Sequence, residues 1–186
     1  MTARVLLGLG ANLGDRRANL RAALGLLEAW CRVLAVSSLY QSAAMVPAGA
    51  SPGPDFLNAA CEVETDLTPH QLRAFVKEIE RTIGREPAPR WSARLIDIDI
   101  LLYGERVVDD EELVIPHPAM TERHFVMAPL AEIAPDAVHP VLGKVIGELA
   151  EDVDFAGLEY VSGPGWASGE AEPDEEEDEG ADGEAE

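Results

Sequence analysis

The sequence predicts an α+β fold of the ferredoxin-like type, a βαββαβ sandwich with additional elements toward its C-terminal end. Three observations predict it. Segments with strand and helix periodicity follow one another as strand, helix, strand, strand, helix, strand, an order that joins two βαβ halves into one sheet with both helices on one face. The 186 residues and the 47% apolar composition suit one globular domain. The sequence also contains no internal repeat.

The first half begins with a predicted buried strand at residues 4–10, RVLLGLG. Asp15 can cap the helix that follows, because its carboxylate can accept a backbone N–H of the first turn. Residues 16–30 carry apolar side chains at helical spacing. The expected inward residues of this helix are Leu20, Ala23, Leu24, Leu27 and Trp30. Residues 31–42, CRVLAVSSLYQS, are predicted to form a second strand.

The second half follows a loop at residues 43–54 that is rich in Ala, Gly and Pro. Residues 55–66 alternate in the manner of a strand. Thr68 followed by Pro69 is typical of a helix start, since Thr caps well and Pro fits the first helical position. The expected inward residues of this helix are Leu72, Phe75, Val76, Ile79 and Ile83.

The remaining segments complete the pattern. Gly84 ends the second helix, and residues 84–94, GREPAPRWSAR, are predicted to form a loop. A fourth strand is expected at residues 95–103, LIDIDILLY. Short helices are expected around residues 117–128 and 143–150, which supplies the additional C-terminal elements.

Negative charge is concentrated at the C-terminal end. The net charge is −21, and residues 170–186 carry eleven acids and no base, so the remainder carries −10. This segment has almost nothing apolar to bury, which predicts a domain at residues 1–160 and a disordered acidic tail at residues 161–186. The acidity argues against a nucleic-acid binder, because such a protein needs a basic surface.

Two cysteines and the distribution of apolar residues indicate the compartment. Cys31 and Cys61 form no CxxC pair and lie in apolar segments, as is typical of buried thiols in a reducing environment. No signal peptide is evident, and no apolar run approaches the roughly 20 residues that span a bilayer. We therefore expect a cytoplasmic protein with no membrane partner. A monomer is the starting expectation for its oligomeric state, which the sequence pattern does not itself indicate.

The predicted strand at residues 95–103 contains two acids within an apolar run. Because side chains alternate across a strand, Asp97 and Asp99 share one face while the isoleucines take the other. Carboxylates at this spacing lie about 6.5–7 Å apart along the strand. They can hold Mg²⁺ ions, and two such ions can act as a clamp in phosphoryl transfer. Two solvated or ion-paired acids on an exposed strand are the alternative.

Basic residues lead into this strand. Arg85, Arg90 and Arg94 lie in the loop that precedes the two aspartates. Arginine forks suit phosphate oxygens, so this loop can close over a polyphosphate and exclude water. Solvated surface arginines are the alternative. Trp91 can stack on a flat ligand, and its alternative role is to anchor the loop by packing.

Three blocks of the chain together resemble one family. The run RWSARLIDIDILLYGERVVDDEELVIPHPAMTERHFVMAPLAEIAP, the N-terminal GLGANLGD and the middle PDFLNAA are similar to segments of the 6-hydroxymethyl-7,8-dihydropterin pyrophosphokinases. The similarity covers about residues 4–150, in matching order. Members of that family have a ferredoxin-like fold. They transfer diphosphate from ATP to the hydroxymethyl oxygen of the pterin with two Mg²⁺ ions, release AMP and make a folate precursor. The resemblance implies the same activity, cofactor and co-substrate here.

The resemblance also implies roles for individual residues. Asp97 and Asp99 would bind the metal and, with Arg85 and Arg94, make up the catalytic set. The implied ATP-binding set is Lys77, Glu80, Arg85, Trp91, Arg94, Ile100, His117 and Arg123. The implied pterin-binding set is Ser42, Ala43, Met45, Phe56, Asn58, Trp91, Asp97 and Phe125. A pterin is flat and polar-edged, so it suits stacking between Phe56 and Phe125, with the amide of Asn58 at its edge.

The sequence departs from the family pattern at several positions. Ser92 and Ala93 replace the usual Gly-Pro before Arg94, which changes the stiffness of the loop. QSAAM replaces the usual Thr-x-Pro segment at Ser42, and Phe56 lacks the hydroxyl of the usual tyrosine. The acidic tail lies outside the family pattern, and the resemblance implies nothing about it.

Two other functional classes are alternatives. A ferredoxin-like regulatory module that binds a small ligand without catalysis would leave Asp97 and Asp99 without a role. A two-metal phosphotransferase for another substrate would keep both acids, but it would not need the set of Phe56, Asn58 and Phe125.

Overall fold

The computed structural model describes residues 2–45, 48–49, 51, 53–84 and 92–169. The elements are, in chain order, β1 (Ala3–Ala11), α1 (Arg16–Leu27), β2 (Cys31–Val36), β3 (Leu39–Ser42), β4 (Phe56–Thr65), α2 (Pro69–Ile83), β5 (Asp97–Tyr103), β6 (Val108–Asp109), β7 (Val114–Ile115), η1 (Met120–Glu122), α3 (His124–Ile133), α4 (Ile146–Glu151), β8 (Leu158–Ser162) and η2 (Pro164–Ala167). No helix among the described residues has the length and apolar character that crossing a bilayer requires.

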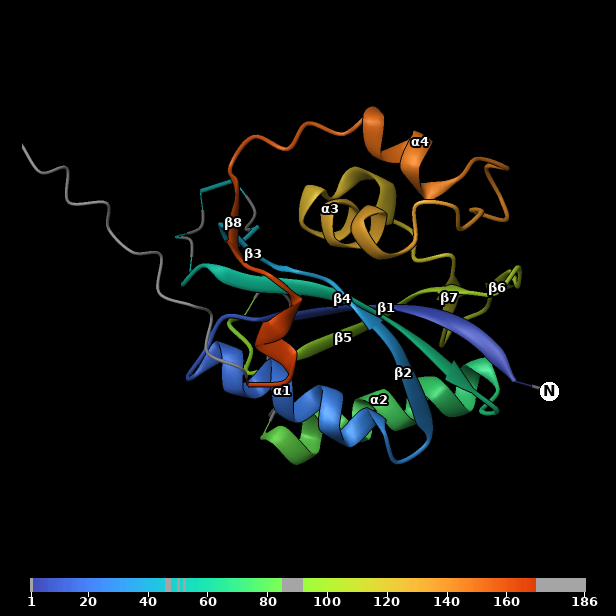
Figure 1. The fold of residues 1–186 in the computed structure, drawn as a ribbon, viewed down its shortest axis with the longest axis horizontal. Helices are drawn as coiled ribbons and strands as arrows, with labels where there is room; N and C mark the ends of the chain where they lie inside the picture. Colours follow the sequence, from blue (N-terminus) through green and yellow to red (C-terminus); the bar gives the residue numbers. More distant parts are fainter. Residues whose placement is uncertain (1, 46–47, 50, 52, 85–91, 170–186) are drawn as a thin grey trace, which may run out of the picture.

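The main sheet confirms the predicted α+β, ferredoxin-like topology. Its six antiparallel strands run in the order β5-β1-β4-β3-β8, and β2 also pairs with β4. The central pair β1 and β4 therefore brings the two βαβ halves together. A second, two-stranded sheet joins β6 and β7. Figure 1 shows α1 and α2 side by side on one face of the main sheet, with α3 and α4 on the other.

Local capping explains where the two main helices begin and end. The Asp15 carboxylate accepts the Ala18 N–H at 2.9 Å, as predicted. At the start of α2, the Thr68 hydroxyl accepts the Gln71 N–H, and the Gln71 side chain accepts the Thr68 N–H, which makes a capping box. Gly84 ends α2 with φ of 109°, a left-handed conformation that favours glycine.

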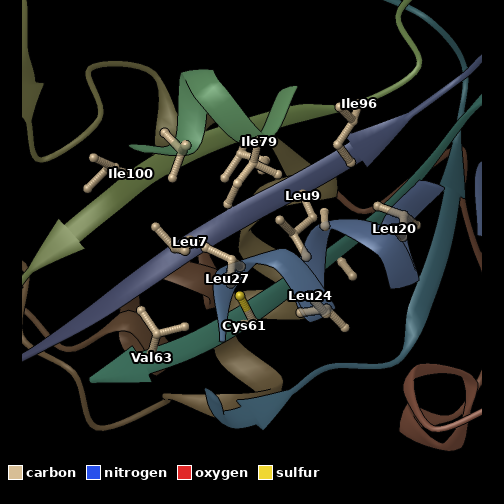
Figure 2. Packing of buried hydrophobic residues seen from close by; sticks show 14 of the residues in the cluster. Leu7, Leu9, Leu20, Leu24, Leu27, Cys61, Val63, Ile79, Ile96 and Ile100 are labelled. Carbon is tan, nitrogen blue, oxygen red and sulfur yellow. The ribbon is translucent and has the colours of Figure 1, made fainter. Parts of the chain in front are cut away.

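One apolar core lies between the sheet and the pair α1 and α2. Figure 2 shows α1 side chains packed over the sheet beside Ile79 of α2. The labelled members of this core are Leu7, Leu9, Leu20, Leu24, Leu27, Cys61, Val63, Ile79, Ile96 and Ile100. Burying one such side chain stabilises the fold by about 1.5–3 kcal/mol. The isoleucine face of β5 is therefore fixed against the helices, and Asp97 and Asp99 must face the other side.

A second core lies under α3 and α4 on the opposite face of the sheet. It is formed by Leu6, Ala60, Leu101, Leu102, Met120, Val126, Met127, Leu130, Ile146 and Leu149. Expected helix positions here need correction. The segment around 117–128 forms the short η1 and then α3, which continues to Ile133. His117 precedes both elements, in keeping with the bias of a residue before proline away from the helical conformation. The segment near 143–150 forms α4, three residues later than expected at its start.

The predicted strand at residues 31–42 is two strands in the structure. Between them, the Ser37 hydroxyl accepts the Ala60 N–H at 2.8 Å, so a side chain replaces one bond of the ladder. The expectation that Trp30 faces inward is also wrong: α1 ends at Leu27, and Trp30 is 65% exposed in the turn that follows.

The folded part of the chain extends beyond residue 160, where the sequence suggests its end. Residue 160 lies inside β8, which pairs with β3. In η2, Trp166 is completely buried, and its indole N–H donates to the Ser37 carbonyl at 2.8 Å. The acidic segment 170–186, expected to be a disordered tail, lies outside the described residues.

Candidate functional site

Three neighbouring strands set the floor of the site. In one row across the sheet, Asn58 of β4, Gly10 of β1 and Asp97 of β5 are aligned, and in the next row Gly8 lies beside Asp99. A Cβ atom on Gly10 would lie 3.5 Å from Asn58 Oδ1. Gly8 and Gly10 of GLGANLGD therefore keep the floor between the amide and the carboxylates free of side chains.

A cavity of about 270 Å³, here called the aromatic cavity, lies over this floor. It is lined by Gly8, Leu9, Gly10, Ser42, Ala43, Ala44, Met45, Phe56, Asn58, Ala59, Ser92, Arg94, Asp97, Asp99, His117, Arg123, Phe125 and Val126. Two aromatic rings, one amide and two arginines thus surround one small space. Every described member of the expected pterin-binding set lines the aromatic cavity. These residues come from strands, a loop and a helix that are distant from one another in the sequence.

A second cavity of about 260 Å³, here called the basic cavity, lies beside the outer edge of β5. Its lining is Arg73, Val76, Lys77, Ile98, Asp99, Ile100, Glu112, Leu113, Val114, His117 and Pro118. Arg73 and Lys77 come from α2 and supply positive charge. Asp99 and His117 line both cavities. The two cavities therefore adjoin, and the shared residues mark the place where two ligands can meet.

The two aspartates lie in an uneven electrostatic environment. Asp97 Oδ2 is 3.1 Å from Arg94 Nη1. The pKa of Asp99 is raised from 3.8 to about 6, chiefly because its half-buried carboxylate is partly removed from water and also because the Asp97 charge is close; Lys77, Arg123 and Arg94 oppose this increase. A proton or a cation at Asp99 is therefore favoured.

His117 is held at the junction by its backbone and its ring. Its N–H donates to the Leu101 carbonyl at 3.0 Å, and its Nδ1 accepts the Ala119 N–H at 3.4 Å. Burial and the nearby Arg123 lower the pKa of His117, so the ring is neutral at pH 7. Because Nδ1 accepts, the ring proton lies on Nε2, which is 3.8 Å from Asp99 Oδ2. His117 thus presents a ring N–H donor at the junction of the two cavities.

Asn58 is oriented by the strand next to it. Its Nδ2 donates to Ser42 Oγ at 3.0 Å and to the Tyr40 carbonyl at 3.2 Å. With the amide nitrogen occupied, Oδ1 is left on the Gly10 side, where it can accept a hydrogen bond from a ligand in the aromatic cavity. Ser42 is 3% exposed, so its hydroxyl acts on the cavity mainly through Asn58.

Glu80, which the resemblance implies lies near the nucleotide, is held by contacts inside the structure. Glu80 lines neither cavity and is 1% exposed. Its Oε1 accepts the Ile98 N–H at 2.8 Å, and Lys77 Nζ is 3.0 Å from its carboxylate. Ile98 lies between the two aspartates on β5, which among the described strands pairs on one side only, with β1. Glu80 therefore supports β5 from α2.

Replacing Glu80 by alanine is expected to lower the free energy of unfolding by about 2 kcal/mol, because the buried Ile98 N–H loses its acceptor. Urea unfolding followed by circular dichroism measures this change. Glu78→Ala is the matched control, since Glu78 lies on the same helix with its side chain 61% exposed and pairs with Arg81. Its expected effect is within about 0.5 kcal/mol. Equal effects for the two variants would contradict the role assigned to Glu80.

The structure describes some of the other expected site residues and leaves the rest outside the described ranges. Lys77, Ile100 and His117 line the basic cavity, and Arg94 and Arg123 line the aromatic cavity. Arg85, Arg90 and Trp91 lie outside the described residues. Arg73, which the sequence pattern does not single out, also lines the basic cavity. Its signal was its position four residues before Lys77, which places both on one helical face.

The carboxylates of Asp97 and Asp99 suit a cation whose other ligands are water molecules and substrate oxygens. Among the residues that the structure describes, no group of three or more His, Cys, Asp and Glu side chains is placed to hold a metal ion. Asp97 and Asp99 instead offer two acidic side chains on one face, beside a cavity with basic walls. Mg²⁺ is typically bound through one or two carboxylates together with substrate phosphates. The residues present therefore fit Mg²⁺.

Comparisons with known proteins show which family the chain resembles. The family model of 7,8-dihydro-6-hydroxymethylpterin-pyrophosphokinase (HPPK) matches residues 6–135. The chain is 44% identical over 160 residues to the 2-amino-4-hydroxy-6-hydroxymethyldihydropteridine pyrophosphokinase of Methylorubrum extorquens, which covers 85% of this chain and 98% of that protein. It is 43% identical over 129 residues to the enzyme of the same name from Bacillus subtilis, which covers 68% of this chain and 75% of that protein.

A solved structure shows the same fold. The wild-type HPPK-DHPS of Plasmodium falciparum with SDX-DHP matches with a TM-score of 0.65 and 17% sequence identity, over 81% of this chain and 44% of that chain. At this identity the likeness supports the fold alone. The family model and the identities above carry the assignment, and the chain belongs to the 7,8-dihydro-6-hydroxymethylpterin-pyrophosphokinase family.

Proposed function

We propose that this chain transfers diphosphate from ATP to the hydroxymethyl group of 6-hydroxymethyl-7,8-dihydropterin, giving AMP and the pterin diphosphate in folate biosynthesis. The observation that carries the proposal is the pair of adjoining cavities that share Asp99 and His117. One cavity has aromatic and amide walls, and the other has basic walls. A flat heterocycle and a nucleoside triphosphate can therefore meet at the shared residues.

The aromatic cavity supplies recognition of the pterin. Phe56 and Phe125 offer ring faces for stacking, and Asn58 Oδ1 offers an acceptor for an N–H group at the edge of the heterocycle. Ser42 fixes the orientation of Asn58. Ala43 and Met45 complete the wall, and Asp97 faces the same space, which directs the hydroxymethyl group toward the junction.

The basic cavity and the arginines supply recognition of ATP. Ile100 and Val76 offer apolar surface to the adenine, while Arg73 and Lys77 offer positive charge to the phosphates. Arg94, Arg123 and His117 surround the junction with donors. Phosphoryl transfer depends mainly on positioning and on neutralising charge, so such donors lower the barrier without a strong protein base. Arg85 and Trp91 are proposed to complete the nucleotide site, on the basis of the sequence resemblance.

We propose that Asp97 and Asp99 hold Mg²⁺, two ions in the reacting complex. When bound, the ions supply positive charge to the phosphate oxygens and align the attacking and leaving oxygens. The chain contributes both carboxylates on one face of a strand, and the closeness of the two negative charges favours a cation between them. We also expect the chain to act as a monomer in the cytoplasm, which sedimentation and fractionation would test.

The activity is tested directly by mixing the protein with Mg²⁺, ATP and 6-hydroxymethyl-7,8-dihydropterin and measuring AMP. The expected result is stoichiometric AMP and pterin diphosphate that depend on all three additions. A reaction without the pterin is the control for ATP hydrolysis. AMP formation no faster than in that control would contradict the proposed function.

Replacing Phe56 by leucine is expected to raise the KM for the pterin about tenfold, because an aliphatic side chain keeps apolar contact but loses stacking worth about 1–3 kcal/mol. The KM for ATP should stay within about twofold, since Phe56 lines only the aromatic cavity. Phe155→Leu is the matched control, because Phe155 lines neither cavity. A parallel rise in the KM for ATP would argue against separate sites for the two substrates.

A further inference from the structure

Gly8 and Gly10 of GLGANLGD form the floor of the aromatic cavity, but Asn12 in the same motif lines neither cavity. Asn12 directly follows β1 and is 3% exposed. Its Oδ1 accepts the Arg94 N–H at 2.6 Å, and its Nδ2 donates to the Pro54 carbonyl at 3.1 Å. The backbone N–H groups of Asn12 and Leu13 donate to the Arg94 carbonyl at 3.0 and 3.2 Å. Both backbone polar groups of Arg94 are thus held by this segment.

These bonds reach two opposite walls of the aromatic cavity. Arg94 lines the cavity, and its guanidinium is 3.1 Å from Asp97 Oδ2. Pro54 lies two residues before Phe56, which lines the same cavity from β4. The neighbouring Asp55 is fastened as well, since its carbonyl accepts from Arg16 Nη1 at 2.8 Å. One buried amide therefore bridges the chain that carries the arginine and the chain that carries the aromatic ring.

We propose that Asn12 is a positioning residue that fixes the Arg94 wall and the Phe56 wall of the aromatic cavity relative to each other. As far as catalysis is concerned, this inference rests on the proposed function. A carboxamide is suited to the task because it offers one acceptor and one donor on a rigid planar group. Aspartate keeps the acceptor for Arg94 and loses the donor for Pro54, whereas alanine loses both.

Amide hydrogen exchange tests the positioning without any substrate. Asn12→Ala is expected to speed exchange of the Arg94 amide about fivefold or more, the scale of one lost hydrogen bond. Asn12→Asp should leave that amide as slow as in the wild type. Asn19→Ala is the matched control, because Asn19 donates from Nδ2 only to the Leu13 carbonyl in the same segment. Equal Arg94 exchange in wild type and Asn12→Ala would overturn the inference.

Kinetics then separate positioning from a merely structural role. Asn12→Ala is expected to lower kcat by about 10- to 100-fold, the cost typical of removing an outer support of a reactive group. Asn12→Asp should mainly raise the KM for the pterin, through the lost bond to Pro54. In the Arg94→Ala background, Asn12→Ala should lower kcat by less than about twofold, because residues in one network are not additive. Fully additive losses would mean that Asn12 does not act through Arg94.

The outcomes distinguish this inference from the proposed function. If the wild type forms no pterin-dependent AMP, the proposed function fails, and hydrogen exchange alone decides whether Asn12 positions Arg94. If the wild type is active and Asn12→Ala does not fold, Asn12→Asp still decides the matter. A pterin KM for Asn12→Asp equal to that of the wild type would then overturn the bridge to the Phe56 wall.

Discussion

Asp97→Asn and Asp99→Asn are each expected to lower the turnover of AMP formation by at least about 100- to 1,000-fold, the range found when one electrostatic group of an active site is removed. Asparagine keeps the shape and size of the side chain, so the sheet and both cores remain intact. It removes the negative charge that holds a cation at the junction of the cavities. Quenched-flow measurement of AMP, with circular dichroism as the folding check, tests the expectation.

Asp136→Asn is the matched control for these two variants. Asp136 is exposed and lines neither cavity, so the turnover of Asp136→Asn should equal that of the wild type. Unchanged turnover in both Asp97→Asn and Asp99→Asn would remove the assignment of a metal to β5. A loss in Asp97→Asn alone would instead indicate that Asp97 serves mainly to orient Arg94.

The same Asp99 variant is expected to be more stable than the wild type when no Mg²⁺ is present. The pKa of Asp99 is about 6 in the folded chain and 3.8 ordinarily, so the folded state binds this proton more tightly. The resulting destabilisation is complete above pH 6 and disappears as the pH falls toward 4. Asp99→Asn should therefore gain about 1 kcal/mol at pH 7, after allowance for solvent screening, and little at pH 4. Urea unfolding at the two pH values measures the difference.

Arg94→Ala is expected to produce the second large loss, a fall in kcat of about 100-fold or more. The Arg94 guanidinium contacts Asp97 and lines the aromatic cavity beside the junction, where charge on the transferred diphosphate must be met. Its bidentate fork also suits phosphate, so Arg94→Lys should restore only part of the rate. Single-turnover kinetics at saturating ATP and pterin separate this effect from weaker binding.

Arg81→Ala is the appropriate control for Arg94→Ala. Arg81 is 67% exposed, pairs with Glu78 on α2 and lines neither cavity. Arg73, which also lies on α2, is unsuitable as a control because it lines the basic cavity. Equal losses in Arg81→Ala and Arg94→Ala would contradict the view that the segment before β5 supplies a reactive arginine.

Local patterns predicted much of the fold correctly, for identifiable reasons. The caps at Asp15 and Thr68 act within three residues of themselves, so the helix starts are visible in the sequence. The alternation in β5 separates the isoleucines from Asp97 and Asp99 whatever the rest of the chain does. The predictions for the C-terminal end were less accurate. There, β8 forms by pairing with β3, and η2 buries Trp166 in a core that other segments build.

The candidate site shows the same division. The expected pterin-binding set could be named from separate blocks of the sequence, because a resemblance to a family identifies residues without knowledge of which residues are in contact. The bond that Glu80 makes could not be predicted, since its position on the helix beside Lys77 does not reveal that its carboxylate turns to the Ile98 N–H. Arg73 and Asn12 were not singled out, because a half-buried arginine and a buried amide show their roles only through the cavity and the bonds around them.

The sequence by itself determined the order of the elements, the helix caps and the shared face of the two aspartates, since these depend on neighbours within a few residues. Only the tertiary structure decided which groups complete the site. Asn12 and Arg94 are 82 residues apart in the chain, and Ser37 and Trp166 are 129 apart, yet each pair is hydrogen-bonded. Such contacts arise from the packing of the sheet and its two cores, and no local pattern encodes them.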